Sequence, residues 1–181
     1  MLNVKLTALA LSLGLVTLPS APQEMPVPTA EHKSLQESVG HWKGTMKSFV
    51  GGMEMEVDAV ETVESIGPFW TQVRFECDFM GMPYTGTGHM GYDPEKKKYV
   101  GTWVDSMSST FALMEGEQKG DTLTMKWMAP DMTGNKVPHW SETTRTKDAY
   151  TAVFYQGEEG TKTMEMSMKR VAQAAEASAG K

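Results

Sequence analysis

The sequence predicts an all-β protein: an antiparallel up-and-down β-barrel of about ten strands with one short N-terminal helix. Apolar and polar side chains alternate with a period of two from His41 to Arg170, as in strands that bury one face. Short turns rich in Gly, Asp and Pro separate these segments, which favours neighbouring antiparallel strands. Closing such a sheet into a barrel removes its unpaired edges. A β-sandwich is the alternative, but the short connections give little sign of the crossovers that a Greek key needs.

The predicted helix follows Thr29, which suits an N-cap, and has Leu35 and Val39 on one side before Gly40 stops it. After it the period changes to two. The predicted strands are residues 41–50, 53–59, 69–78, two strands within 86–107, and residues 108–115, 121–128, 137–146, 149–156 and 161–170.

The first 21 residues predict a signal peptide, because one Lys precedes an apolar run and then Pro19-Ser20-Ala21. A buried helix is the alternative. We expect residues 22–29 to be a Pro-rich linker, residues 30–170 the β-barrel domain and residues 171–181 a disordered tail. The protein is therefore expected to be exported, either periplasmic or secreted.

Composition limits the partners. The net charge of −6 argues against nucleic acid or an anionic membrane surface as a partner of the mature form, since both need clustered Lys and Arg. Cys77 is the single cysteine, so no intrachain disulfide forms, and we expect a buried thiol.

The segment from Gly86 to Met107 is expected to form a hairpin around the turn at Asp93-Pro94. If Tyr92 lies opposite Tyr99, the register pairs Met90 with Gly101, Gly88 with Trp103 and Gly86 with Asp105, all on one face. Glycine leaves space for a facing side chain. Trp103 then either packs over Gly88 as core, or forms the wall of a pocket in which Asp105 is the polar anchor.

Methionine is unusually frequent, with 16 residues. Those on the apolar parity of their strands, and so expected inside the barrel, are Met53, Met55, Met80, Met82, Met90, Met107, Met125, Met164, Met166 and Met168. Core filling, an adaptable pocket for an apolar or aromatic molecule, and a Cu(I) site are the three alternatives. The candidate ligand-binding residues are Trp103, Asp105, Trp127, Met55, Met90, Met125 and Met166.

No catalytic or metal-ligand set is recognisable, and no cofactor is predicted. The four histidines, His32, His41, His89 and His139, are scattered along the chain. Asp105 is the one carboxylate expected to point inward, where it would act as a base of raised pKa, or be hydrogen-bonded, or pair with Arg145 or Arg74. Enzyme activity is thus left open, with a binding protein favoured.

Two stretches resemble a bacterial family, the domain of unknown function 1579. Glu31-His32-Lys33 with Leu35, Gly40, Trp42 and Gly44 resembles its opening, and Gly91-Tyr92-Asp93 with residues 102–106 resembles its middle signature. The resemblance covers residues 32–170. It implies a ten-stranded barrel of the calycin superfamily, which includes lipocalins and nitrobindins, and it brings no established activity.

Gly40-His41-Trp42 is similar to the Gly-x-Trp of lipocalins, which implies that Trp42 closes one barrel end beneath Arg170. The hairpin register makes Gly86 and Gly88 further structural residues. Likeness to nitrobindins suggests haem, for which His139 is the candidate because His89 shares the outer face with Thr87 and Thr102. We therefore expect an exported protein that binds a small apolar molecule inside a β-barrel. A structural or interaction barrel with a filled core, and a metal- or haem-binding protein, are the alternatives.

Overall fold

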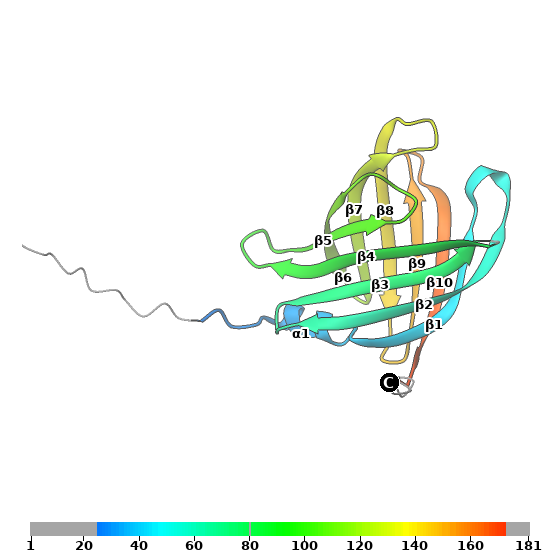
Figure 1. Cartoon of the computed structure of the whole chain (residues 1–181). Helices are drawn as coiled ribbons and strands as arrows, with labels where there is room; N and C mark the ends of the chain where they lie inside the picture. The colour runs from blue at the N-terminus through cyan, green and yellow to red at the C-terminus, as the bar shows by residue number, and fades with distance from the viewer. Residues whose placement is uncertain (1–24, 80, 173–181) are drawn as a thin grey trace, which may run out of the picture.

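Ten antiparallel strands form a closed barrel in the computed structural model, which describes residues 25–79 and 81–172. Each strand pairs with its neighbour in sequence, and β1 pairs with β10 to close the cylinder (Figure 1). The elements are α1 (Ala30–Gln36), β1 (Gly40–Ser48), η1 (Val50–Gly52), β2 (Met55–Ile66), β3 (Trp70–Phe79), β4 (Met82–Asp93), β5 (Lys98–Asp105), β6 (Ala112–Lys119), β7 (Thr122–Pro130), β8 (Lys136–Arg145), β9 (Ala149–Gln156) and β10 (Thr161–Val171). The predicted fold class is confirmed. The predicted signal peptide and most of the predicted tail lie outside the described residues.

The two ends of the barrel differ. We call the end that carries α1 and the turns β2–β3, β4–β5, β6–β7 and β8–β9 the closed end, and the opposite end the open end. Helix α1 contacts β3 and β4, and the Gln36 side chain donates to the Trp70 carbonyl at 3.2 Å. In Figure 1, β2 to β4 run across the picture while β7 to β9 run up it, so the two halves of the wall cross at a steep angle.

Trp42 and Arg170 fix the closed end. Trp42 is 1% exposed, and its Nε1 donates to the Ser38 carbonyl at 3.0 Å. The guanidinium carbon of Arg170 lies 4.2 Å from the centre of the Trp42 ring, and Nη1 donates to the Val39 carbonyl at 2.6 Å. A Cβ at Gly40 would lie 2.3 Å from Arg170 Nη1, so the glycine leaves room for the guanidinium. This is the arrangement that the lipocalin resemblance implies.

Helix α1 is short and is held by His32 as well as by Leu35. The backbone N–H of Thr29 donates to His32 Nδ1 at 3.1 Å, which caps the first turn. The buried His32 ring meets Phe69 and Tyr92 edge to face, at 5.2 and 5.7 Å. The helix ends at Gln36, before the predicted Val39, because the chain there turns toward β1.

The predicted hairpin register is confirmed pair by pair, from Tyr92 opposite Tyr99 to Gly86 opposite Asp105. The Trp103 indole lies flat across the two glycines. A Cβ added at Gly86 would lie 2.1 Å from Trp103 Cζ2, and one at Gly88 would lie 2.8 Å from Trp103 Cε3. Gly86 therefore makes room for the Trp103 side chain, and Gly88 makes room both for it and for the Thr102 carbonyl, from which the added Cβ would lie 2.2 Å.

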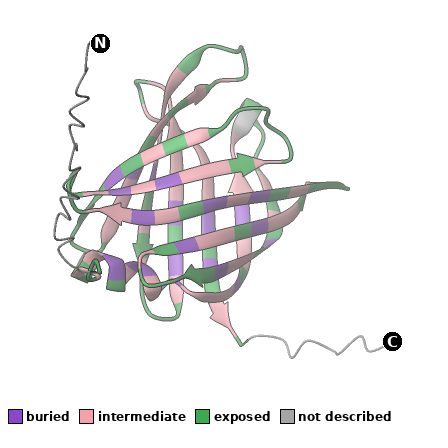
Figure 2. Ribbon diagram, turned by 60° about the vertical axis from the view of Figure 1, so that its left-hand side comes forward, coloured by how far each residue is buried: buried purple, intermediate pink, exposed green. Residues whose placement is uncertain are grey.

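Buried and exposed residues alternate along the strands, and the core lies inside the barrel (Figure 2). Its buried members are Trp42, Met46, Ala59, Val63, Phe75, Tyr150, Ala152, Met166 and Met168. The methionine prediction is wrong at three positions, because Met53, Met82 and Met107 are exposed at the open end. Strand alternation does not extend to them, since they stand at or beyond strand ends, and Met80 lies outside the described residues.

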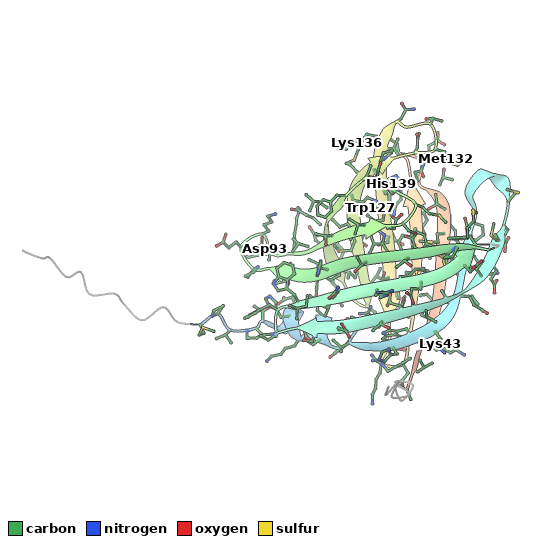
Figure 3. All side chains as sticks on the ribbon, in the orientation of Figure 1. Lys43, Asp93, Trp127, Met132, Lys136 and His139 are labelled. Atoms are coloured by element: carbon green, nitrogen blue, oxygen red, sulfur yellow. The ribbon has the colours of Figure 1, made fainter. Side chains whose placement is uncertain are left out.

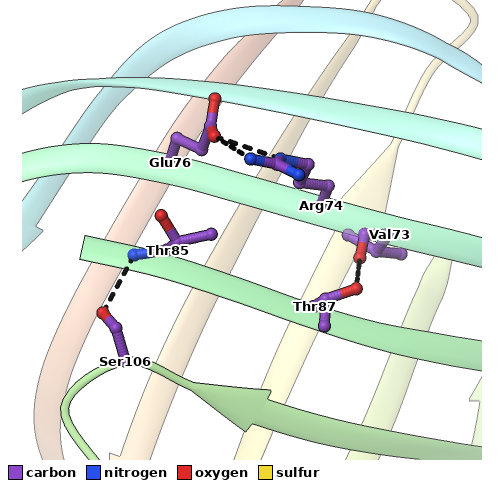
Figure 4. A network of polar contacts seen from close by, with 6 residues as sticks. All are labelled: Val73, Arg74, Glu76, Thr85, Thr87 and Ser106. Atoms are coloured by element: carbon purple, nitrogen blue, oxygen red, sulfur yellow. Dashed lines mark hydrogen bonds and ion pairs between the residues drawn. The ribbon is translucent and has the colours of Figure 1, made fainter. Parts of the chain in front are cut away.

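The outer wall of β3 and β4 carries ordinary polar contacts (Figure 4). Arg74 Nη2 pairs with Glu76 Oε1 at 2.7 Å, and both side chains are exposed. Thr87 Oγ1 donates to the Val73 carbonyl at 2.9 Å, and the Thr85 N–H donates to Ser106 Oγ at 3.1 Å. Exposed pairs of this kind contribute about 0–1 kcal/mol. Arg74 thus belongs to the outer face and has no part in the interior.

Candidate functional site

The barrel wall parts between β6 and β7 at the open end. The two strands pair over residues 115–119 and 122–126. Above these pairs, the described residues 112–114 of β6 and 127–130 of β7 have no register with each other. We call this the β6–β7 seam. The predicted strand from Ser108 begins only at Ala112, because Ser108 and Thr110 instead hydrogen-bond to each other in the preceding loop.

A hollow of about 810 Å³ lies over the β6–β7 seam. Its lining comes from the β5–β6 loop, β6, β7, β8 and the β9–β10 turn, and includes Phe111, Leu113, Trp127, Met128, Pro138, His139 and Trp140, with Glu115, Lys126, Lys136, Glu142 and Glu158 around them. Phe111 is 60% exposed, Leu113 68% and Met128 50%. Large apolar side chains that share one exposed concave surface mark an interaction site more often than chance placement does.

Trp127 and His139 stand opposite each other on β7 and β8 and form the inner wall of this hollow (Figure 3). Their rings stack with centres 5.7 Å apart and an interplanar angle of 20°. Phe154 of β9 meets Trp127 edge to face at 6.4 Å. Three aromatic rings from consecutive strands therefore stand at the open end.

Burial lowers the pKa of the His139 imidazole, against an opposing contribution from the Ala129 carbonyl. Its Nε2 is buried and has no hydrogen-bond partner among the described residues. Because this nitrogen has almost no accessible surface, it is not presented to the hollow as an axial ligand would be. His139 therefore does not fit the role of a haem ligand.

Trp103 and Asp105 stand on β5 at the open end, where Trp103 pairs with Ala112 of β6 and both residues lie near Tyr84, but neither lines the hollow. Trp103 Nε1 donates to the Tyr84 hydroxyl at 3.3 Å, and burial raises the pKa of Tyr84 to about 12. Asp105 Oδ1 accepts the N–H of Met107 at 2.9 Å. The expected pairing of Asp105 with Arg145 or Arg74 is wrong, since Arg145 stands at the closed end and Arg74 on the outer face.

The predicted methionines are placed differently from one another. Met125 and Met166 are buried in the packed clusters. Met90 packs beside Gly101, where an added Cβ would lie 2.6 Å from its sulfur. Met55 is partly buried at the start of β2. Of the seven predicted ligand-binding residues, Trp127 lines the hollow; ligand contacts by the others stay a prediction.

Sequence reasoning missed Phe111 and Leu113, although a signal for Leu113 was present: an apolar side chain on the polar parity of its strand. It also missed a polar cluster at the closed end. Glu61 shares the inward parity of Ala59 and Val63, and burial raises the pKa of its carboxyl to about 7. A glutamate on the apolar parity was visible in the sequence and is the signal that would have found it.

Among the described residues, no group of three or more His, Cys, Asp and Glu side chains gathers in a way that could hold a metal ion. None of the described helices has the length and apolar character needed to cross a membrane.

Two solved structures share the barrel architecture at low sequence identity. Rv2717c from M. tuberculosis is 11% identical, with a TM-score of 0.60 over 80% of this chain and 99% of that chain. The S-type phycobiliprotein lyase CPES from Guillardia theta is 11% identical, with a TM-score of 0.55 over 81% and 95%. No curated protein matches the sequence. The family model described as "Protein of unknown function (DUF1579)" matches residues 27–170, and the chain belongs to this family.

Proposed function

We propose that this protein binds a small apolar or aromatic molecule at the open end of its barrel, at the β6–β7 seam. The observation that carries the proposal is the exposed apolar lining of Phe111, Leu113 and Met128 beside the ring of Trp127. Burying such surface beneath a ligand is favourable by about 25 cal/mol per Å². Small-molecule sites typically combine an apolar concave surface with a few polar groups, and Lys126, Lys136 and Glu142 supply these at the rim.

Secondary support comes from the fold. One of the similar barrels is named a phycobiliprotein lyase, which is in keeping with a small-ligand partner. We also propose that the protein is exported, on the strength of the apolar run and the Pro-Ser-Ala sequence within the first 21 residues.

A structural or interaction barrel is the second candidate. The packed cluster around Trp42, Phe75 and Met168 favours it, because this part of the interior is largely filled by side chains. The two candidates differ in whether the purified barrel takes up an apolar probe at the seam.

The test uses N-phenyl-1-naphthylamine, an uncharged aromatic probe whose fluorescence rises on entering an apolar site. We expect saturable binding to the purified full chain, weakened about five- to tenfold by Leu113→Ser, because one large apolar contact is lost. Ile66→Ser is the matched control, since Ile66 is also an exposed apolar residue on a strand but stands at the closed end, away from the hollow. Absence of saturable binding, or equal weakening by both variants, would favour the structural barrel.

A further inference from the structure

We propose that Glu61, Arg145 and Tyr150 form a second site, inside the closed half of the barrel, that binds the carboxylate of an apolar acid. This site is separate from the hollow at the seam, and the proposal does not depend on the proposed function.

The three side chains face the lumen just above Trp42. Glu61 stands between Trp42 and Phe75 in the strand registers, both of which point inward. Arg145 and Tyr150 are directly opposite each other on β8 and β9. The guanidinium carbon of Arg145 is 5.4 Å from the centre of the Tyr150 ring and 5.9 Å from that of Trp42. The polar groups therefore come from three strands and meet over an aromatic floor.

Two of these groups are buried donors without an acceptor. Among the described residues, Arg145 Nε and the Tyr150 hydroxyl have no hydrogen-bond partner. The Tyr150 hydroxyl faces the Glu61 carboxyl closely enough to lower the pKa of that carboxyl by hydrogen bonding, although the two groups do not reach full hydrogen-bond geometry. Buried polar groups are almost always satisfied, so Arg145 Nε and the Tyr150 hydroxyl each lack a fully formed hydrogen bond that a ligand could supply when Glu61 is protonated.

The missing acceptor should carry negative charge. None of the ion pairs formed by the described residues involves Arg145 or Glu61. A second guanidinium, that of Arg170, lies on the Trp42 ring and donates its hydrogen bonds to backbone carbonyls. A guanidinium and a phenol that point into the same space match the two oxygens of a carboxylate.

Several inward-facing side chains between this cluster and the open end are only partly buried. Glu61 and Arg145 keep some accessible surface although the wall surrounds them, and so do the inward-facing Val57, Val73 and Trp103. Met46, Met164 and Met166 stand along the same interior, and flexible thioether side chains adapt to an apolar tail. The apolar lining is why the ligand class is an apolar acid rather than a small hydrophilic anion.

Glu61 makes the site sensitive to pH. Its neighbours with charge or titratable groups are Arg145, Tyr150 and, around them, Arg170 and Glu37. Burial raises the pKa of Glu61 to about 7, and a bound carboxylate would raise it further by repulsion. The protonated carboxyl then leaves Arg145 to the ligand, whereas the ionised one competes for it. Binding should therefore take up a proton and weaken as the pH rises through about 7.

The test compares decanoate with decan-1-ol, which has the same chain length and no charge, by calorimetry on the purified full chain at about pH 6 and about pH 8. We expect decanoate to bind at least tenfold more tightly than decanol at the lower pH and to lose about tenfold at the higher one. Tyr150→Phe keeps the ring against Trp42 and should weaken decanoate about tenfold, with decanol changed less than about twofold. Arg145→Gln should cost more, and Arg74→Gln, an exposed arginine on the outer face, is the matched control.

Equal affinity for the two probes, or decanoate binding that Tyr150→Phe leaves unchanged, would show that ordered water satisfies the buried donors and would overturn the proposal. So would the absence of decanoate binding at the lower pH. If the variants fail to fold, the wild-type comparison of the two probes at two pH values decides. Weakening of decanoate by Leu113→Ser instead of Arg145→Gln would place the acid at the seam and overturn the inner site.

Discussion

The closed and open ends of this barrel each contain a tryptophan with aromatic neighbours. The two ends differ in how completely the surrounding chain encloses that ring. At the closed end, Trp42 is buried, its N–H is bonded to Ser38, and Arg170 covers its ring. At the open end, Trp127 also has aromatic neighbours, but exposed apolar side chains lie beside it and the strands have parted. A tryptophan fully enclosed by its own chain stabilises the fold, whereas one beside exposed apolar surface is available to a partner.

The largest difference in stability between the two ends is expected when each tryptophan is replaced by alanine. Trp42→Ala should lower the free energy of unfolding by about 3–5 kcal/mol, since it removes a buried ring and leaves a cavity under Arg170. Trp127→Ala should cost about 1–2 kcal/mol because that ring is only partly buried. Urea unfolding of both variants measures the difference, and similar losses at the two ends would contradict it.

The free energy of unfolding should depend on pH because of one residue at the closed end. Burial raises the pKa of Glu61 from 4.5 to about 7, so between these two pH values the unfolded chain loses the Glu61 proton while the folded protein keeps it. The free energy of unfolding of the wild type should therefore fall by roughly 3 kcal/mol across this window. Above about pH 7 both states are ionised and the decline levels off. Glu61→Gln should remove this decline and be more stable than wild type at about pH 8. The check is urea unfolding at several pH values, with Glu64→Gln on the exposed face of β2 as the control. Parallel wild-type and Glu61→Gln curves would contradict the expectation.

The smallest effect concerns the open half of the β4–β5 hairpin. Gly86→Ala should cost about 1–3 kcal/mol by overpacking, since the new methyl would meet the Trp103 ring. In a Trp103→Ala background the same change should cost little, because the three atoms nearest to that methyl all belong to the Trp103 side chain. Gly88→Ala provides the contrast, as its methyl also meets the Thr102 carbonyl and should remain costly. A double-mutant cycle in thermal unfolding measures the coupling.

Much of the wall was predictable because strand alternation is a local property. The register from Gly86 to Tyr92 follows from one turn at Asp93-Pro94, and each further pair is then fixed. The contact of Trp42 with Arg170 could be expected only through a family resemblance, since 128 positions separate them in the numbering and no local pattern links them.

The open end and the inner cluster were less accessible to sequence reasoning. Alternation does not say where a strand stops, which is why β6 was expected from Ser108 and why Met53 and Met107 were expected inside. The β6–β7 seam is a failure of two strands to pair, and pairing depends on the whole cylinder. Arg145 and Glu61 were each visible, but only closure of the barrel brings β2 near β8 and β9.

The pairing of β1 with β10 has a consequence for how the chain acquires its shape. The first strand finds its second partner only after residues 161–171 have been synthesised, so the cylinder cannot shut while the chain is incomplete. Until then β1 and β9 each expose a row of unbonded N–H and C=O groups, which are templates for association with other chains. Loss of the final strand should therefore show itself as aggregation during biogenesis.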